Sequence, residues 1–238
     1  MKTFKKTLSF LLKAVFYAVL SVILIIGAST AYSYYKRSQS DATISELRKL
    51  EPNSKNSNII KQLDQSKDQL GFLMGRLPSL SAEDTRLVIS WLLNHEREGN
   101  LPYYYLISVS FAKLRNTEQS LNYFELARLT SRLDDIRCND KSSSGAYIAL
   151  ESTIFSIPDR KLKNNSSLAI ASKSWAYTYE ETVKNRKPAM WICMHGMNFF
   201  NGGIKLLSED EWSKARTKFR VNYMAANIKE LVPKKRVD

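Results

Sequence analysis

The longest uninterrupted apolar stretch of the chain lies near the N-terminus, at residues 14–35. Its sequence, AVFYAVLSVILIIGASTAYSYY, contains no charged residue in 22 positions. A helix rises about 1.5 Å per residue, so this stretch is long enough to cross a hydrocarbon core about 30 Å thick. We therefore expect a transmembrane helix that contacts the lipid bilayer through residues 14–35, preceded by a basic N-terminus at residues 1–13.

The lysines around this stretch predict its orientation, because basic residues beside a membrane span favour the cytoplasmic side. Four of them precede the stretch, at Lys2, Lys5, Lys6 and Lys13. Lys36 and Arg37 follow it and weaken the preference without reversing it. The expected topology is a single-pass inner-membrane protein of a Gram-negative bacterium, with a cytoplasmic N-terminus and a periplasmic C-terminal domain.

A cleavable signal peptide is the alternative interpretation of the same stretch. Ser29 and Ala31 are small residues at the spacing of a cleavage site, and a basic segment precedes the apolar run. The run is longer than the apolar part of an ordinary signal peptide, which favours the anchor. Cleavage would leave a secreted protein, so the body of the chain is exported under either interpretation.

The pattern after the apolar stretch predicts an all-α domain. Residues 36–58 are mostly polar and are expected to form a linker, either a short helix or a stalk. Helical spacing of apolar residues starts at residue 59 and continues through the domain at 59–238. Residues 189–207 are apolar but rich in glycine, which favours a packed irregular segment or a broken helix. The expected helices are 59–77, 82–98 with Ser81 as its cap, one opened by Pro102, one capped by Thr117, 146–157, 166–184 and one that starts from a capping box at Ser208 and ends before Pro233.

Residues 101–134 resemble one tetratricopeptide repeat. With Leu101 as the first position, the positions that the repeat fills with characteristic residues hold Tyr104, Ile107, Ser108, Phe111, Ser120, Phe124 and Ala127. Arg132 stands where the repeat usually ends in proline, and no second unit of equal quality is present. The resemblance implies a helical hairpin that binds peptides or proteins in a groove. A single repeat would need neighbouring helices to cover its apolar face.

Residues of the hairpin are the candidates for contact with an unidentified protein partner. Aromatic side chains on exposed helix faces are typical of binding hot spots. The alternative is that these side chains are ordinary core, and several must be. The candidates are Tyr103, Tyr104, Tyr105, Phe111, Asn122 and Tyr123.

The two cysteines, Cys138 and Cys193, are candidates for a disulfide because the compartment expected for the domain is oxidising. Two buried free thiols are the alternative. The bond would close a loop of about 55 residues and stabilise the fold by up to about 4 kcal/mol through chain entropy. The sequences around the cysteines, Arg137–Asp140 and Trp191–Met197, also resemble a pattern in exported bacterial proteins to which no activity is attached.

No motif indicates catalysis, a cofactor or a metal site. The only histidines, His95 and His195, lack the spacing of a zinc-binding helix, and no phosphate-binding glycine loop occurs. Adjacent acids at Asp134–Asp135 and Glu180–Glu181 are more typical of surface charge than of paired catalytic carboxylates. We therefore expect a non-enzymatic scaffold or assembly factor; a cell-envelope hydrolase without a recognisable motif is the alternative.

The basic excess of the chain, +13, overstates the charge of the domain. Six of the 36 basic residues lie in the first 37 residues, which contain no acid, so 30 basic and 23 acidic residues remain, a net charge of +7. We discount nucleic acid as a partner on this ground. Four basic residues, Lys214, Arg216, Lys218 and Arg220, are expected to form a solvated face, with contact to anionic headgroups or acidic partners as its functional alternative.

Overall fold

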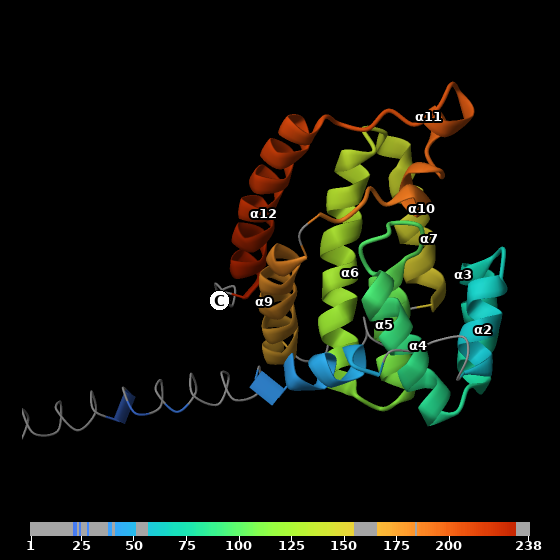
Figure 1. Ribbon diagram of the computed structural model, residues 1–238. Helices are drawn as coiled ribbons and strands as arrows, with labels where there is room; N and C mark the ends of the chain where they lie inside the picture. The colour runs from blue at the N-terminus through green and yellow to red at the C-terminus, as the bar shows by residue number, and fades with distance from the viewer. Residues whose placement is uncertain are drawn as a thin grey trace, which may run out of the picture. The chain divides into compact units, whose positions relative to one another are not determined.

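The computed structural model describes residues 21–22, 24, 28, 38–39, 41–50, 57–154, 166–183 and 185–231. All regular secondary structure in these ranges is helical (Figure 1), which confirms the all-α prediction. Contacts within the chain separate two units, Met1–Glu46 and Leu47–Asp238. Each unit is described by itself below.

Most of the N-terminal unit lies outside the described residues, and with it the expected basic N-terminus at 1–13 and anchor at 14–35. Of the anchor, Ser21, Val22, Leu24 and Ala28 are described, and all four are helical. Across the described parts of the chain, no helix combines the length and the apolar character that a membrane crossing needs. The transmembrane anchor thus stays a prediction.

The second unit is a set of helices around a long central one. In Figure 1, α6 stands in the middle, with α4 and α5 on one side of it and α9 and α12 on the other. The helices are α2 (Asn58–Gln65), α3 (Gln69–Arg76), η1 (Leu77–Ser79), α4 (Ala82–His95), α5 (Tyr103–Lys113), α6 (Thr117–Arg137), η2 (Lys141–Ser144), α7 (Gly145–Ile154), α9 (Ser166–Thr182), α10 (Met190–Cys193), α11 (Met197–Phe200) and α12 (Glu209–Leu231).

The predicted helical hairpin is present as α5 and α6. Small residues let the two helices approach closely, and the Ser108 hydroxyl donates a hydrogen bond of 2.6 Å to the backbone carbonyl of Ser120. Tyr105 and Phe124 meet edge to face beside this contact. α6 continues for 21 residues to Arg137, three residues beyond the predicted hairpin.

The cap of α6 differs from the prediction by one residue. Asn116, rather than Thr117, precedes the helix, and its side-chain oxygen accepts a hydrogen bond of 3.2 Å from the backbone N–H of Gln119. Asparagine and threonine are both good caps, so composition alone does not choose between neighbours. The caps of α4 and α12 are as predicted: Ser81 accepts from the N–H of Asp84, and Ser208 exchanges hydrogen bonds with Glu211.

One predicted helix needs correction, and in the linker the structure shows which of two alternatives applies to the described residues. The helix expected at 59–77 is interrupted between α2 and α3, where the Asp68 carboxylate accepts a hydrogen bond of 2.8 Å from the N–H of Gly71 and starts a new helix. Within the linker at 36–58, residues 41–48 are helical, which agrees with the short-helix alternative for that part. Arg48 donates hydrogen bonds to the Glu96 carboxylate at 2.5 Å and to the Tyr179 hydroxyl at 2.8 Å, so the linker is bound to the helical unit at this point.

Gly99 allows the turn that leads from α4 to α5. Its φ of 75° lies in the left-handed region, and a Cβ at this position would collide with the backbone carbonyl of Pro188. The segment before Pro188 is held there by a hydrogen bond of 2.8 Å from the Lys187 N–H to the Arg97 carbonyl. Position 99 therefore requires glycine for two separate reasons, its positive φ and the close approach of the Pro188 carbonyl.

We predict that Gly99→Ala lowers the free energy of unfolding by about 2 kcal/mol or more, because it adds backbone strain and a steric clash. Gly75→Ala is the matched control: Gly75 is helical and exposed, and a Cβ there meets no atom within 4 Å. The control should leave stability unchanged or raise it by up to about 1 kcal/mol. Chemical denaturation followed by circular dichroism measures the free energy of unfolding of both variants. Equal effects of the two changes would contradict the special role of Gly99 in the turn.

Candidate functional site

The six residues expected to line a binding groove are buried instead. Their exposed fractions range from 0% to 6%, so the expectation that they face a partner is wrong for the described chain. Four of the six lie on α5, whose buried residues occupy every side of the helix, and the other two lie on the central helix α6, so other elements cover both helices. The six residues are Tyr103, Tyr104, Tyr105, Phe111, Asn122 and Tyr123.

A small cavity with polar side chains in its lining lies beside this aromatic core. It is lined by the end of α4, the start of α5, the second half of α6 and the segment that leads into α10, and it has a volume of about 20 Å³. Polar side chains reach it from every one of these elements. The polar lining includes Glu96, Tyr103, Tyr104, Thr130, Ser131, Asp134 and Arg186.

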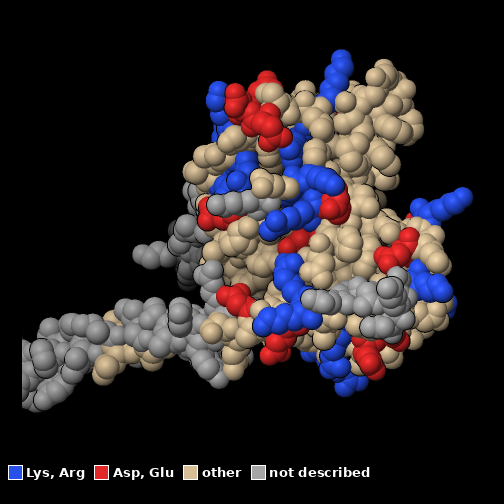
Figure 2. Space-filling model, in the orientation of Figure 1, with Lys and Arg blue, Asp and Glu red and all other residues tan. Residues whose placement is uncertain are grey.

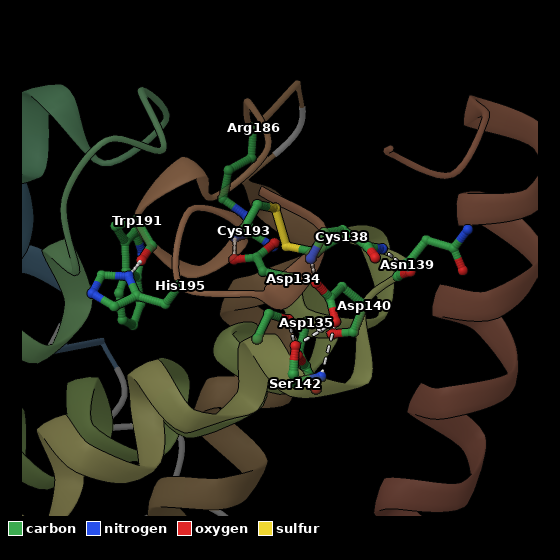
Figure 3. Close-up of a disulfide and its surroundings, with 12 residues drawn as sticks. Asp134, Asp135, Cys138, Asn139, Asp140, Ser142, Arg186, Trp191, Cys193 and His195 are labelled. Carbon is green, nitrogen blue, oxygen red and sulfur yellow. Dashed lines mark hydrogen bonds and ion pairs between the residues drawn. A yellow bond between two sulfur atoms is a disulfide. The ribbon is translucent and has the colours of Figure 1, made fainter. Parts of the chain in front are cut away.

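Two buried carboxylates of this lining each have an arginine partner. Arg186 forms an ion pair with Asp134 (Figure 3), and the two side chains are 11% and 4% exposed. Arg48 pairs with Glu96. Burial raises the pKa of Asp134 and that of Glu96, and the positive charge of the arginine opposes the rise in each case.

Carboxylates of raised pKa in a cavity are what the hydrolase alternative requires. The size of the cavity argues against it, since about 20 Å³ accommodates roughly one water molecule and no sugar ring. Both carboxylates are also bound by guanidinium groups and unavailable as free acids or bases. The arrangement is suited to holding distant segments of the chain together.

The disulfide predicted from the cysteine count is present next to this cavity. Cys138, directly after α6, and Cys193, the last residue of α10, are both buried, with their Cα atoms 5.2 Å apart (Figure 3). Asp134 lies one turn before Cys138 on α6, and its carbonyl accepts the N–H of Cys138. The bond and the Asp134–Arg186 pair thus fix the same two stretches of chain to each other.

A polar brace then positions the segment after the disulfide. The Asp140 carboxylate accepts a hydrogen bond of 2.7 Å from the N–H of Asn198, and the Ser142 hydroxyl oxygen accepts one of 2.7 Å from the N–H of Met197. The Ser142 hydroxyl in turn donates a hydrogen bond to the Asp140 carboxylate, and this bond, followed by the one from the Asn198 N–H, lowers the pKa of Asp140, so the carboxylate is ionised at neutral pH. The loop that contains Asp140 and Ser142 therefore holds the start of α11.

The braced segment carries a group of exposed apolar side chains, which we call the α11 knob. In Figure 1, α11 projects beyond the other helices of its unit, and in Figure 2 the same region shows almost no charged surface. Between Met190 and Leu207 the only ionisable side chains besides the bonded cysteine are His195 and Lys205, and neither is acidic. The knob consists of Met194, Met197, Phe199, Phe200 and Leu206, which are 40% to 71% exposed.

The sequence predicted a packed or broken segment here, and the broken helix is observed as α10 and α11 with turns between them. It did not predict that the apolar residues point outward. The signal that could have indicated this is the density of glycine and asparagine around Phe199 and Phe200, which favours turns at the surface. Gly202 and Gly203 have positive φ angles in one such turn.

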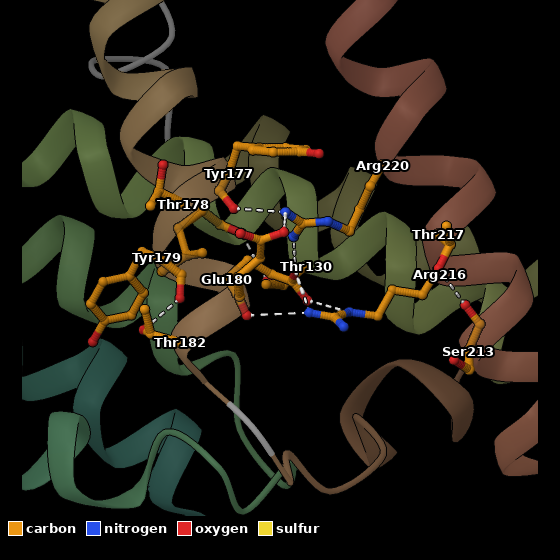
Figure 4. Close-up of polar contacts among 12 residues, drawn as sticks. Thr130, Tyr177, Thr178, Tyr179, Glu180, Thr182, Ser213, Arg216, Thr217 and Arg220 are labelled. Atoms are coloured by element: carbon orange, nitrogen blue, oxygen red, sulfur yellow. Dashed lines mark hydrogen bonds and ion pairs between the residues drawn. The ribbon is translucent and has the colours of Figure 1, made fainter.

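The expected basic face on α12 is divided between surface and interior. Arg216 binds the Glu180 carboxylate through two hydrogen bonds of 2.8 and 2.9 Å, and Arg220, 5% exposed, binds the same carboxylate (Figure 4). Lys214 and Lys218 are exposed. Residues four apart share a helix face, so the four positions form one inward and one outward pair rather than a single stripe.

The adjacent acids that looked like surface charge are also divided. Glu180 is buried against α12, whereas Glu181 is 58% exposed. Asp134 is buried against Arg186, and Asp135 receives a hydrogen bond from the Ser143 hydroxyl. Each pair therefore contributes one side chain to the interior and one to a more accessible position.

Comparison with protein-family models, with curated proteins and with solved structures finds no match to this chain. In the part of the chain that the structure describes, no group of three or more His, Cys, Asp or Glu side chains could hold a metal ion. The function has to be inferred from the geometry of the residues themselves.

We predict that Glu180→Gln lowers the free energy of unfolding by about 3–5 kcal/mol, because it removes the buried carboxylate that compensates the buried guanidinium of Arg220 and leaves only the exposed Glu181 beside it. Glu181→Gln is the matched control on the neighbouring residue. Glu181 also contacts Arg220, at 2.7 Å, but it is exposed, so its loss should cost about 1 kcal/mol or less. Denaturant titration compares the two variants. Equal losses would show that burial of Glu180 does not decide the strength of this cluster.

Proposed function

We propose that this protein is a membrane-tethered scaffold or assembly factor that binds a partner protein outside the cytoplasm through the α11 knob. The observation that carries the proposal is the outward orientation of Met197, Phe199 and Phe200 on a segment braced by Asp140 and the disulfide. The tether is the apolar stretch at 14–35, whose length and lack of charge support a membrane anchor.

The exposure of these side chains is unusual for a surface without a partner. Phe200 is 71% exposed and Met197 is 57% exposed, although burial of such side chains is favourable. Contiguous exposed apolar groups mark interaction sites in many proteins, and aromatic residues and methionine are enriched in protein interfaces. Methionine also adapts its shape to a partner surface.

The brace makes the knob suitable for specific binding. The disulfide fixes Cys193 just before the knob, and the hydrogen bond from the Leu207 N–H to the Arg137 carbonyl, 3.0 Å long, fixes the chain just after it. A segment held at both ends loses less conformational freedom when it binds. Preorganisation of this kind supports affinity without a large contact area.

The charge of the knob defines the partner surface that fits it best. The exposed ionisable groups are Lys205 and His195, and acidic side chains are absent between Met190 and Leu207. The complementary surface is an apolar groove bordered by acidic side chains. A lipid surface fits less well, since one lysine adds only about 1 kcal/mol of attraction to anionic lipids.

The buried hairpin has a supporting role in this proposal. α5 and α6 form the rigid interior that carries the knob, and the tetratricopeptide resemblance of residues 101–134 stays a prediction about that hairpin. The basic N-terminus, the periplasmic location and the single-pass topology are likewise proposed from the sequence.

The proposal predicts a discrete crosslink from the knob. A photoreactive phenylalanine analogue placed at position 200 of the full chain, in native membranes, should form an adduct with one protein. The same analogue at Val221, which is 62% exposed on α12, is the matched control and should not form that adduct. Adducts with lipid alone would identify the bilayer as the surface that the knob contacts and would contradict the proposal.

The captured protein must then bind the purified full chain through the same residues. Phe200→Asp should raise the dissociation constant about thirtyfold, the effect of losing a hot spot of about 2 kcal/mol. Val221→Asp should leave it unchanged. Equal affinities of the two variants would show that the crosslinked protein is a neighbour of the knob and not its ligand.

A further inference from the structure

Two enclosed polar atoms in the cavity next to the disulfide have no hydrogen-bond partner among the described residues. They are the hydroxyl oxygen of Tyr104 and Oδ1 of Asp134. Both residues line the cavity, one from the start of α5 and the other from the second half of α6. Buried polar atoms are almost always hydrogen-bonded, to protein atoms or to ordered water, so these two require an explanation.

We propose that the cavity is a binding site for a single ordered water molecule, which accepts a hydrogen bond from the Tyr104 hydroxyl and donates one to Oδ1 of Asp134. The volume of the cavity, about 20 Å³, exceeds the roughly 10–15 Å³ that one water requires. Two polar partners are the fewest that hold an internal water.

The donor and acceptor roles follow from the chemistry of the lining. Burial raises the pKa of Tyr104 well above its ordinary value, so its hydroxyl keeps its proton and donates it. The other carboxylate oxygen of Asp134, Oδ2, is bound by Arg186, which leaves Oδ1 as an acceptor. A neutral molecule that accepts one hydrogen bond and donates another satisfies both atoms.

The charges around the cavity favour water over an ion of similar size. The carboxylates of Asp134 and Glu96 are neutralised by Arg186 and Arg48. An ammonium ion would add an unpaired positive charge next to the Arg186 guanidinium in an enclosed space. An anion such as chloride has no proton to donate to Oδ1 of Asp134 and would leave that acceptor unpaired.

The water site goes beyond the proposed binding function and does not depend on it. The water would connect α5 to α6 at the point where the Asp134–Arg186 pair connects α6 to the segment before α10. It would thereby complete the hydrogen bonding of Asp134, the acid that lies one turn before Cys138.

Crystal structures of three forms of the full chain, grown without ammonium salts, test the site. The wild type should show one spherical density peak at about 2.8 Å from both the Tyr104 hydroxyl and Oδ1 of Asp134. Tyr104→Phe removes only the hydroxyl, and the peak should be lost. Tyr103→Phe is the matched control, because Tyr103 lines the same cavity but its hydroxyl already donates to Asn100. The peak should persist in this control.

Three results would overturn the proposal. One is a wild-type structure with no peak in the cavity, and another is a direct hydrogen bond between the Tyr104 hydroxyl and Asp134. The third is a peak of unchanged strength in Tyr104→Phe. The wild-type crystals decide the question even if Tyr104→Phe fails to fold.

Discussion

Buried carboxylates that meet guanidinium groups from distant parts of the sequence are the constraint on which the helical unit depends. A charged side chain in the interior is costly unless a partner compensates it. A packing of the helices is therefore stable only if it brings each of these buried acids to its arginine. Other packings of the same helices would leave a buried charge without a partner. The pairs are Asp134 with Arg186, Glu96 with Arg48, and Glu180 with Arg216 and Arg220.

This constraint also explains where a binding surface can be. The interior beside α6 is filled by tyrosines and ion pairs, and the cavity among them holds no more than a water-sized molecule. Interaction with a partner must then use the outside of the unit. The α11 knob is the part of the described surface that combines large exposed apolar groups with a rigid attachment, through the disulfide and the Asp140 brace.

Features of the fold that depend on neighbours in the sequence were predictable. Ser81 and Ser208 cap their helices as expected because the cap and the N–H that it accepts from are three residues apart. The cysteine pair was predictable from the even count and the expected compartment. The left-handed conformation of Gly99 was predictable because it favours glycine, although α4 ends at His95, before the residue 98 that the sequence predicted.

Features that depend on contacts between residues far apart in the sequence were not predictable. Tyr104 and Phe111 have the residue types of a binding surface, and only the packing of α6 and later segments shows that they are core. Arg220 has the composition of a surface stripe until Glu180, 40 residues earlier, is brought to it. Phe200 shows the converse: an apolar residue type does not reveal that the turn around it points the ring outward.

The most direct test of the central constraint is a double-mutant cycle on Asp134 and Arg186, with Asp134→Asn, Arg186→Gln and the double variant in the full chain. Chemical denaturation measures the free energy of unfolding of each form. Each single change leaves a buried charge without its partner. The sum of the two single losses in unfolding free energy should therefore exceed the loss in the double variant by about 2 kcal/mol. Losses that add to within about 0.5 kcal/mol would show that the two side chains are not coupled and would contradict the account.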